Sequence, residues 1–202
     1  MGELIIRHET EEDYFEAEEI IRLAFWNLYR PGCYEHYLLH QLRDCQSYLP
    51  DLSFIAEKNG YLEGGIYCEK ATIATELNAD DVLTFSPLGI DPSFQREGVG
   101  TLLVEKVIEE AKAHGFKAIV VIGLPDYFPR FGFKPASLYG ITMPDKSVPP
   151  ELQILELEKG FLPDFRGGYF MQPNLLSEEP DLYDLHEYDK AFPFMEKKDF
   201  PE

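Results

Sequence analysis

The chain has 202 residues, 45% of them hydrophobic and 27% charged, which is typical of one globular domain and not of a disordered protein. Its net charge of −19 opposes binding to nucleic acids and anionic membranes, because such proteins gather lysine and arginine on their surfaces. The chain shows no apolar run of about 20 residues, no signal-peptide pattern and no CxxC pair. We therefore expect a cytoplasmic protein with buried thiols, no disulfide framework and no metal.

The hydrophobic pattern then predicts strands and helices in alternation. Thr10 and Asp13 have the spacing of a capping box, and Gly115 supplies a helix stop. Asn59-Gly60 is a strong hairpin signal. The expected elements are, in order, a strand at residues 3–8, a helix at 14–28, a helix at 34–48, strands at 52–57, 61–69 and 82–91, a helix at 98–114, a buried strand at 118–122, and strand-like pieces at 139–143 and 153–157.

Two further features of these elements can be predicted. The strand, helix and strand between residues 82 and 122 form one right-handed crossover, so the two strands are expected to be parallel. The helix within it has an apolar face that we expect to turn inward. This face consists of Val99, Leu102, Leu103, Val107 and Ala111.

The C-terminal end is acidic and aromatic. Residues 177–202 carry nine acidic residues against three lysines, a net charge of −6. Their interleaved aromatic residues indicate that the segment docks elsewhere on the chain. We expect this segment to attract a cationic substrate or to shield the groove that binds it. The interleaved aromatic residues are Tyr183, Tyr188, Phe192, Phe194 and Phe200.

A candidate anion-binding turn lies at residues 95–100, directly before a predicted helix. Gly98 and Gly100 let backbone N–H groups converge on an anion, and the helix dipole adds about half a positive charge at that end. The strand before the turn contains Pro87, which has no N–H, and Gly89, which weakens pairing. We expect a bulge there that leaves backbone groups available to an extended, amide-bearing ligand.

This stretch resembles the acetyl-CoA signature of GNAT N-acetyltransferases, written Q/R-x-x-G-x-G/A. Leu88-Gly89-Ile90-Asp91-Pro92 is followed by Gln95-x-x-Gly98-x-Gly100 and Leu102-Leu103. Farther on, Val120-Val121-Ile122-Gly123 and Tyr127-Phe128-x-Arg130-Phe131-Gly132-Phe133-Lys134-Pro135-Ala136 resemble the YhbS-like branch of that family. The resemblance runs in order from residue 3 to about 174, so we divide the chain into a domain at 1–174 and an extension at 175–202.

The resemblance implies an α/β fold of the mixed α+β kind: the GNAT fold, a splayed mixed β-sheet flanked by helices. It also implies acetyl-CoA as cosubstrate, with pantetheine bonded to the main chain at Leu88 and Ile90 and the pyrophosphate on the amides from Arg96 to Thr101. The implied cofactor-binding residues are Leu88, Gly89, Ile90, Gln95, Arg96, Glu97, Gly98, Val99, Gly100 and Thr101.

The implied activity is acetyl transfer to a primary amine by direct attack. The alternative is an acyl-CoA-binding sensor or interaction module without turnover, because a fold does not guarantee chemistry. The acceptor is expected to be a small-molecule or protein amine and to be cationic. A homodimer is left open.

The sequence identifies the residues that would donate and accept protons less clearly than the cofactor-binding residues. Some family members place a basic Glu six residues before the position of Ile90, where this chain has Thr84. Many place a proton-donating Tyr where this chain has Phe128, so the neighbouring Tyr127 is the candidate catalytic residue. Other possible bases are Glu57, Glu69, Glu76 and His36.

Three competing sites fit the sequence less well. A Rossmann dinucleotide site would have a third glycine where Leu103 stands, and a Walker A loop would have Lys and Ser or Thr after its second glycine. His36 and His40 have metal-ligand spacing, yet no third ligand is evident. We therefore retain the acetyl-CoA interpretation.

Overall fold

The computed structural model describes residues 2–173, 175 and 179–200. The chain divides into two compact units, and β3, β4 and α3 run from one unit into the other. The first unit comprises residues 1–67, 86–104 and 174–202, and the second comprises residues 68–85 and 105–173.

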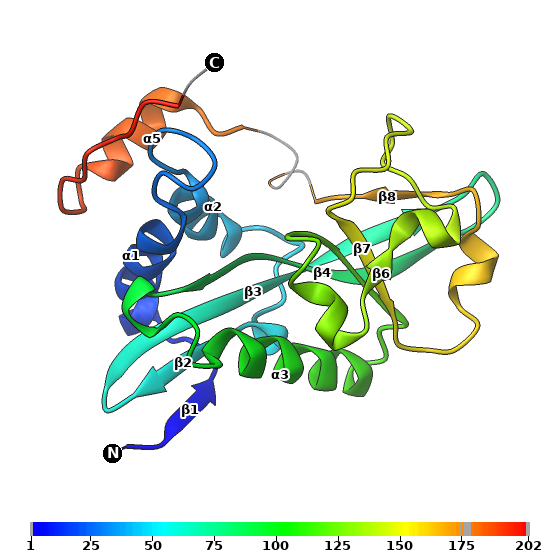
Figure 1. The fold of residues 1–202 in the computed structure, drawn as a ribbon, viewed down its shortest axis with the longest axis horizontal. Coiled ribbons are helices and arrows are strands. Elements are labelled where there is room, and N and C mark those ends of the chain that lie inside the picture. The colour runs from blue at the N-terminus through cyan, green and yellow to red at the C-terminus, as the bar shows by residue number, and fades with distance from the viewer. Residues whose placement is uncertain (1, 174, 176–178, 201–202) are drawn as a thin grey trace. The chain divides into compact units, whose positions relative to one another are not determined.

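The described residues form strands, α-helices and short 3-10 helices (Figure 1). The strands are β1 (Leu4–Arg7), β2 (Phe54–Lys58), β3 (Tyr61–Ala74), β4 (Ala79–Ile90), β5 (Ala118–Ile122), β6 (Lys134–Pro135), β7 (Leu152–Glu156) and β8 (Tyr169–Met171). The α-helices are α1 (Tyr14–Phe25), α2 (Glu35–Leu42), α3 (Val99–Ala113) and α5 (Leu182–Asp189). The 3-10 helices are η1 (Glu11–Asp13), η2 (Pro50–Leu52), η3 (Pro92–Phe94), η4 (Phe128–Phe131), η5 (Ala136–Tyr139) and η6 (Leu162–Phe165).

Among the described residues the strands make one mixed sheet in the order β1-β2-β3-β4-β5-β7-β6, with β8 paired to β3. β4 and β5 are parallel, with Leu83 opposite Ile119, as the crossover predicted. The pairs β1–β2, β2–β3, β3–β8, β5–β7 and β6–β7 are antiparallel. The last residues of β4, from Ser86, belong to the first unit, so the predicted splay of the sheet stays a prediction.

The first unit confirms the local signals near the N-terminus. The Asp13 carboxylate accepts the Thr10 N–H at 2.7 Å, as in the predicted capping box, and α1 follows directly. Asn59 and Gly60 have φ angles of 55° and 80° and join β2 to β3. The core of this unit contains Ala17, Ile20, Ile21, Leu39, Leu42, Ile55, Leu62 and Tyr67.

The second unit has its own core, formed by buried side chains from β3, β4, β5, β7 and β8 and from the segments that join them. β5 has the predicted bounds, although Ile122 at its end is 42% exposed. The helix stop at Gly115 is also confirmed, with φ 81°. The core contains Ala71, Ile73, Val82, Ala118, Val120, Ala136, Ile141, Leu152, Ile154, Phe161, Leu162, Phe165 and Phe170.

Several predicted details are wrong. The second helix ends at Leu42 and not at residue 48, because the next residues form tight turns such as Cys45 N–H to the Leu42 carbonyl. Residues 139–143 are not a strand, since Ile141 N–H bonds back to the Ala136 carbonyl around a left-handed Gly140. β6 and β8 were not predicted. On α3, Leu102 is 45% exposed and Val104 takes a buried place instead.

Other sequence predictions concern thiols and membranes. Cys33 and Cys68 are buried thiols outside any disulfide, as expected, and Cys45 is half-buried. Within the described ranges, the structure contains no helix with the length and apolar character needed to cross a bilayer.

Candidate functional site

The end of β4 lies in close contact with β3 and α1, and two glycines permit this. A Cβ atom on Gly64 of β3 would lie 2.8 Å from the Gly89 carbonyl oxygen, and one on Gly89 would lie 2.6 Å from Ile21 Cδ1 of α1. Real Cβ atoms do not approach this closely. Larger residues at either position would therefore push β4 away from its neighbours.

The connection from β4 to the turn is fixed by polar contacts. The Asp91 N–H donates to the Glu63 carbonyl at 2.9 Å, and the Asp91 carboxylate accepts the Ser93 N–H at 2.7 Å. The Gln95 side chain donates to the Ile90 carbonyl at 3.1 Å. This last bond gives the signature glutamine a structural role that the sequence reasoning did not identify: it ties the turn to the strand.

The turn itself has an unusual backbone. Arg96 and Gly98 have positive φ angles of 67° and 94°, and a Cβ on Gly98 would meet no heavy atom within 4 Å. Leu102 N–H bonds to the Gly98 carbonyl at 3.1 Å. The amides of Val99 to Thr101 precede that bond, so helix geometry leaves them at the free N-terminal end of α3.

This arrangement suits an anion. Amides at a helix start and the positive end of the helix dipole together make the backbone of this turn electropositive. Open space in front of Gly98 gives a phosphate group access to it. The sequence-predicted cofactor residues from Leu88 to Thr101 all belong to the first unit.

Tyr127 lies in the second unit, at the N-cap of η4. Arg130 covers its ring, with the guanidinium carbon 4.6 Å from the ring centroid, and donates to its carbonyl at 2.9 Å. Phe128 is a packing aromatic that is only 6% exposed. Its ring centroid lies 5.5 Å from that of Phe133 and 5.7 Å from that of Phe85. The proton-donor role of Tyr127 stays a prediction.

The candidate bases lie in different surroundings. Glu57 accepts Arg7 Nε at 2.7 Å, and the same guanidinium binds Asp13 and lowers the pKa of that carboxyl to about 2. Glu69 is fully buried and Glu76 is exposed. Thr84, at the position where some relatives have a Glu, is buried with 4% exposure.

The two helical histidines face carboxylates. His36 Nε2 lies 3.1 Å from Asp189 Oδ1, and His40 Nδ1 lies 3.2 Å from Glu18 Oε1. In the part of the chain that the structure describes, no group of three or more His, Cys, Asp or Glu side chains is placed to hold a metal ion.

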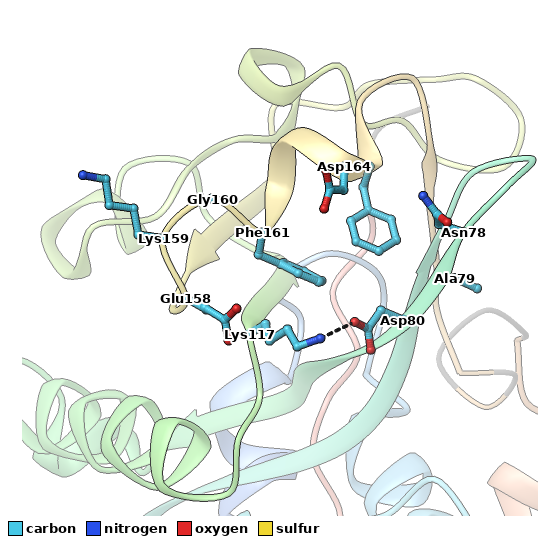
Figure 2. A pocket seen from close by; sticks show the side chains of 10 residues that line it. Asn78, Ala79, Asp80, Lys117, Glu158, Lys159, Gly160, Phe161 and Asp164 are labelled. Atoms are coloured by element: carbon cyan, nitrogen blue, oxygen red, sulfur yellow. Dashed lines mark hydrogen bonds and ion pairs between the residues drawn. The ribbon is translucent and has the colours of Figure 1, made fainter.

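A recess of about 350 Å³ lies elsewhere, within the second unit (Figure 2). Figure 2 shows Lys117 bonded to Asp80 beside the ring of Phe161. The Lys117 Nζ to Asp80 Oδ2 distance is 2.7 Å. The recess shares no residue with the turn at 95–101. Its ion pair is partly exposed and mutually neutralised, so it does not show the features of an anion site.

The comparison with known families is decisive. A model of the acetyltransferase (GNAT) family matches residues 13–133, more than half of the chain. The chain belongs to the GNAT family. The match includes α1, the end of β4, the turn and η4, and so contains every residue that the sequence resemblance singled out for cofactor binding.

Similar proteins support this assignment. The chain is 31% identical over 122 residues to the uncharacterized N-acetyltransferase YjhQ of Escherichia coli K12, and the match covers 60% of this chain and 64% of that protein. The chain thus spans less than two thirds of that relative's length.

Solved structures show the same fold. YhbS from Escherichia coli, in complex with CoA, has a TM-score of 0.74 at 20% identity, covering 89% of this chain and 95% of YhbS. A GNAT family acetyltransferase from Brucella melitensis, in complex with acetyl-CoA, has a TM-score of 0.68 at 22% identity, covering 87% of this chain and 99% of that one. The predicted mixed-sheet GNAT fold is confirmed.

Proposed function

We propose that the protein is an acetyl-CoA-dependent N-acetyltransferase that acts on a primary amine. The observation that carries the proposal is the turn before α3, with positive φ at Arg96 and Gly98 and open space in front of Gly98. Family membership and the CoA and acetyl-CoA complexes of the two similar structures support it.

In this proposal the amides from Arg96 to Thr101 hold the pyrophosphate and the main chain at Leu88 and Ile90 holds pantetheine. Bulky groups at Gly64 or Gly89 would shift β4, so these glycines keep the pantetheine-binding backbone in place. Gln95 acts indirectly, because its bond to the Ile90 carbonyl sets the distance between the strand and the turn.

The chemistry requires two proton movements. The amine nitrogen attacks the thioester carbonyl carbon, a C–N bond forms and the C–S bond breaks, and the departing thiolate takes up a proton while the amine loses one. We assign the proton donation to Tyr127 and name no base. Glu57 is bound by Arg7 and His36 faces Asp189, so neither is oriented as a free acceptor.

Further parts of the proposal concern the acceptor and the domain organisation. We propose a cationic amine as acceptor, since the chain carries a net charge of −19, and direct attack as the mechanism. We also retain the division into a domain at 1–174 and an extension at 175–202. Residues 1, 174, 176–178 and 201–202 lie outside the described residues.

Two measurements test the function. Calorimetric titration with CoA tests cofactor binding, and release of free thiol from acetyl-CoA across a panel of primary amines tests turnover. We expect micromolar-range binding and amine-dependent thiol release. Binding without thiol release above the amine-free rate would favour the sensor alternative, and absence of CoA binding would refute the proposal.

A further inference from the structure

The C-terminal segment 181–198, called the strap below, is docked on α1 and α2 within the first unit (Figure 1). Phe192 stacks on Phe15 of α1, with ring centroids 4.8 Å apart and planes 3° apart, and meets His36 of α2 edge-on. Tyr188 lies against Tyr37 and His40 of α2. The strap therefore contacts both helices through aromatic side chains.

A buried ionic centre fixes the strap to α1. Asp189 Oδ1 lies 2.9 Å from Arg22 Nε and 3.1 Å from His36 Nε2. The Arg22 side chain is only 4% exposed and His36 is 0% exposed. Burial raises the pKa of Asp189, but the hydrogen bonds from His36 and Arg22 outweigh it and lower that pKa overall. Without Asp189 the guanidinium would be a buried charge lacking its counterion, which is strongly unfavourable.

Hydrogen bonds beyond α5 fix the position of the strap along α1. Arg22 Nη1 donates to the Pro193 carbonyl at 3.0 Å, and Trp26 Nε1 donates to the Glu196 carbonyl at 3.0 Å. The Arg22 guanidinium also stacks on the Trp26 ring, 4.2 Å from its centroid. Main-chain contacts of this kind fix one register and distinguish specific docking from a loose apolar contact.

Helix α1 also contacts the end of β4, the strand whose main chain we assign to pantetheine binding. Ile21, the neighbour of Arg22 on α1, packs so closely on Gly89 that a Cβ there would lie 2.6 Å from its terminal methyl. Ala24 Cβ would lie 3.2 Å from that Cβ atom. α1 therefore lies between the strap, which binds Arg22, and the strand that carries Leu88 and Ile90.

We propose that the strap positions α1 against the cofactor strand, with Arg22 as the positioning residue through which Asp189 acts. This inference rests on the proposed function. It goes further by making CoA affinity depend on a segment that belongs neither to the GNAT signature nor to the matched residues 13–133. If the strap came loose and α1 shifted, the end of β4 would shift with it, because the two elements are tightly packed and neither can move alone without losing contacts.

Cys33 offers a readout of strap docking that does not involve CoA. Its sulfur lies 3.5 Å from His36 Nδ1, and the side chain is 5% exposed. Burial, together with the charge of Glu35, raises the pKa of this thiol to about 12. Loosening the Asp189–His36 contact should increase alkylation of Cys33, which peptide mass spectrometry separates from alkylation of Cys45 and Cys68.

The experiment compares full-length Asp189→Asn with full-length Asp184→Asn. The control makes the same charge change on an exposed residue of the same helix. We expect Asp189→Asn to speed Cys33 alkylation and to raise the Kd for CoA about tenfold, within the range of coupling between linked sites. Asp184→Asn should match the wild type in both measurements.

A milder variant keeps the inference testable if Asp189→Asn does not fold. Trp26→Phe removes the bond to the Glu196 carbonyl but keeps a ring beside Arg22, and we expect a smaller change in the same direction. Faster alkylation of Cys33 with an unchanged Kd for CoA would overturn the inference, as would no change in either. If the wild-type chain itself binds no CoA, the proposed function fails first, which the wild-type titration reveals separately.

Discussion

Replacing Gly98 by alanine tests whether the turn before α3 binds the pyrophosphate, and Gly115, just after the same helix, offers a matched control. Gly98 and Gly115 have φ angles of 94° and 81°, and a Cβ atom on either would meet no heavy atom within 4 Å. Both substitutions should therefore cost a similar backbone strain of roughly 1–2 kcal/mol. Only the Gly98 methyl group enters the space where we place the pyrophosphate.

The magnitude follows from the hydrogen bonds at risk. Losing one charge-assisted bond from a turn amide to phosphate costs about 1.5–3 kcal/mol, so Gly98→Ala should weaken CoA binding roughly 10- to 100-fold. Gly115→Ala should leave the affinity within about twofold of wild type, because no proposed ligand contact lies there. Calorimetric titration with CoA measures both, and thermal unfolding verifies their equal stability. If Gly98→Ala and Gly115→Ala both fold and bind CoA with equal affinity, the assignment of the pyrophosphate to this turn is refuted.

Three further predictions concern chemistry, packing and acid stability. Tyr127→Phe should lower kcat about 10²- to 10⁴-fold with nearly unchanged CoA affinity, and a kcat within about twofold of wild type excludes the donor role. Gly89→Val should lower the free energy of unfolding by about 1–3 kcal/mol through collision with Ile21; an unchanged urea midpoint would show that α1 can move away. Because its pKa is lowered from 3.8 to about 2, Asp13 stabilises the fold above pH 3.8 and loses this effect as the pH falls toward 2. Its pair with Arg7 is partly exposed, so screening leaves about 1 kcal/mol, and Asp13→Asn should flatten the acid-unfolding curve over that range.

The sequence predicted those elements whose signals are local. The Asn59-Gly60 turn, the stop at Gly115 and the apolar run of β5 each depend on a few adjacent residues, and all three lie at the predicted positions. β6 and β8 are short and become strands only because β7 and β3 offer them partners. No window of a few residues contains that information, because tertiary pairing determines it.

In the candidate site, too, the sequence predicts the features that depend on adjacent residues and not those that depend on contacts between distant segments. Glycines before a helix indicate an anion-binding turn from spacing alone, and Gly98 has the positive φ that such a turn requires. The sequence does not show that Gly89 packs on Ile21, or that Gln95 reaches the Ile90 carbonyl, because these contacts depend on how distant segments meet. For the same reason the sequence does not show which side chains surround Phe128, which packs beside Phe85 and Phe133 in the structure.

We predict two separable roles for the acidic extension, and ionic strength distinguishes them. A net charge of −6 predicts long-range attraction of a cationic acceptor, which salt should weaken because the Debye length shortens to about 8 Å at physiological ionic strength. The Asp189–Arg22 pair is buried and in contact, so salt screens it much less. Raising the salt concentration should therefore increase the acceptor KM while the alkylation rate of Cys33 stays constant. If both change together, strap docking depends on surface charge and not on the buried pair; if the KM does not respond, the extension does not steer the acceptor.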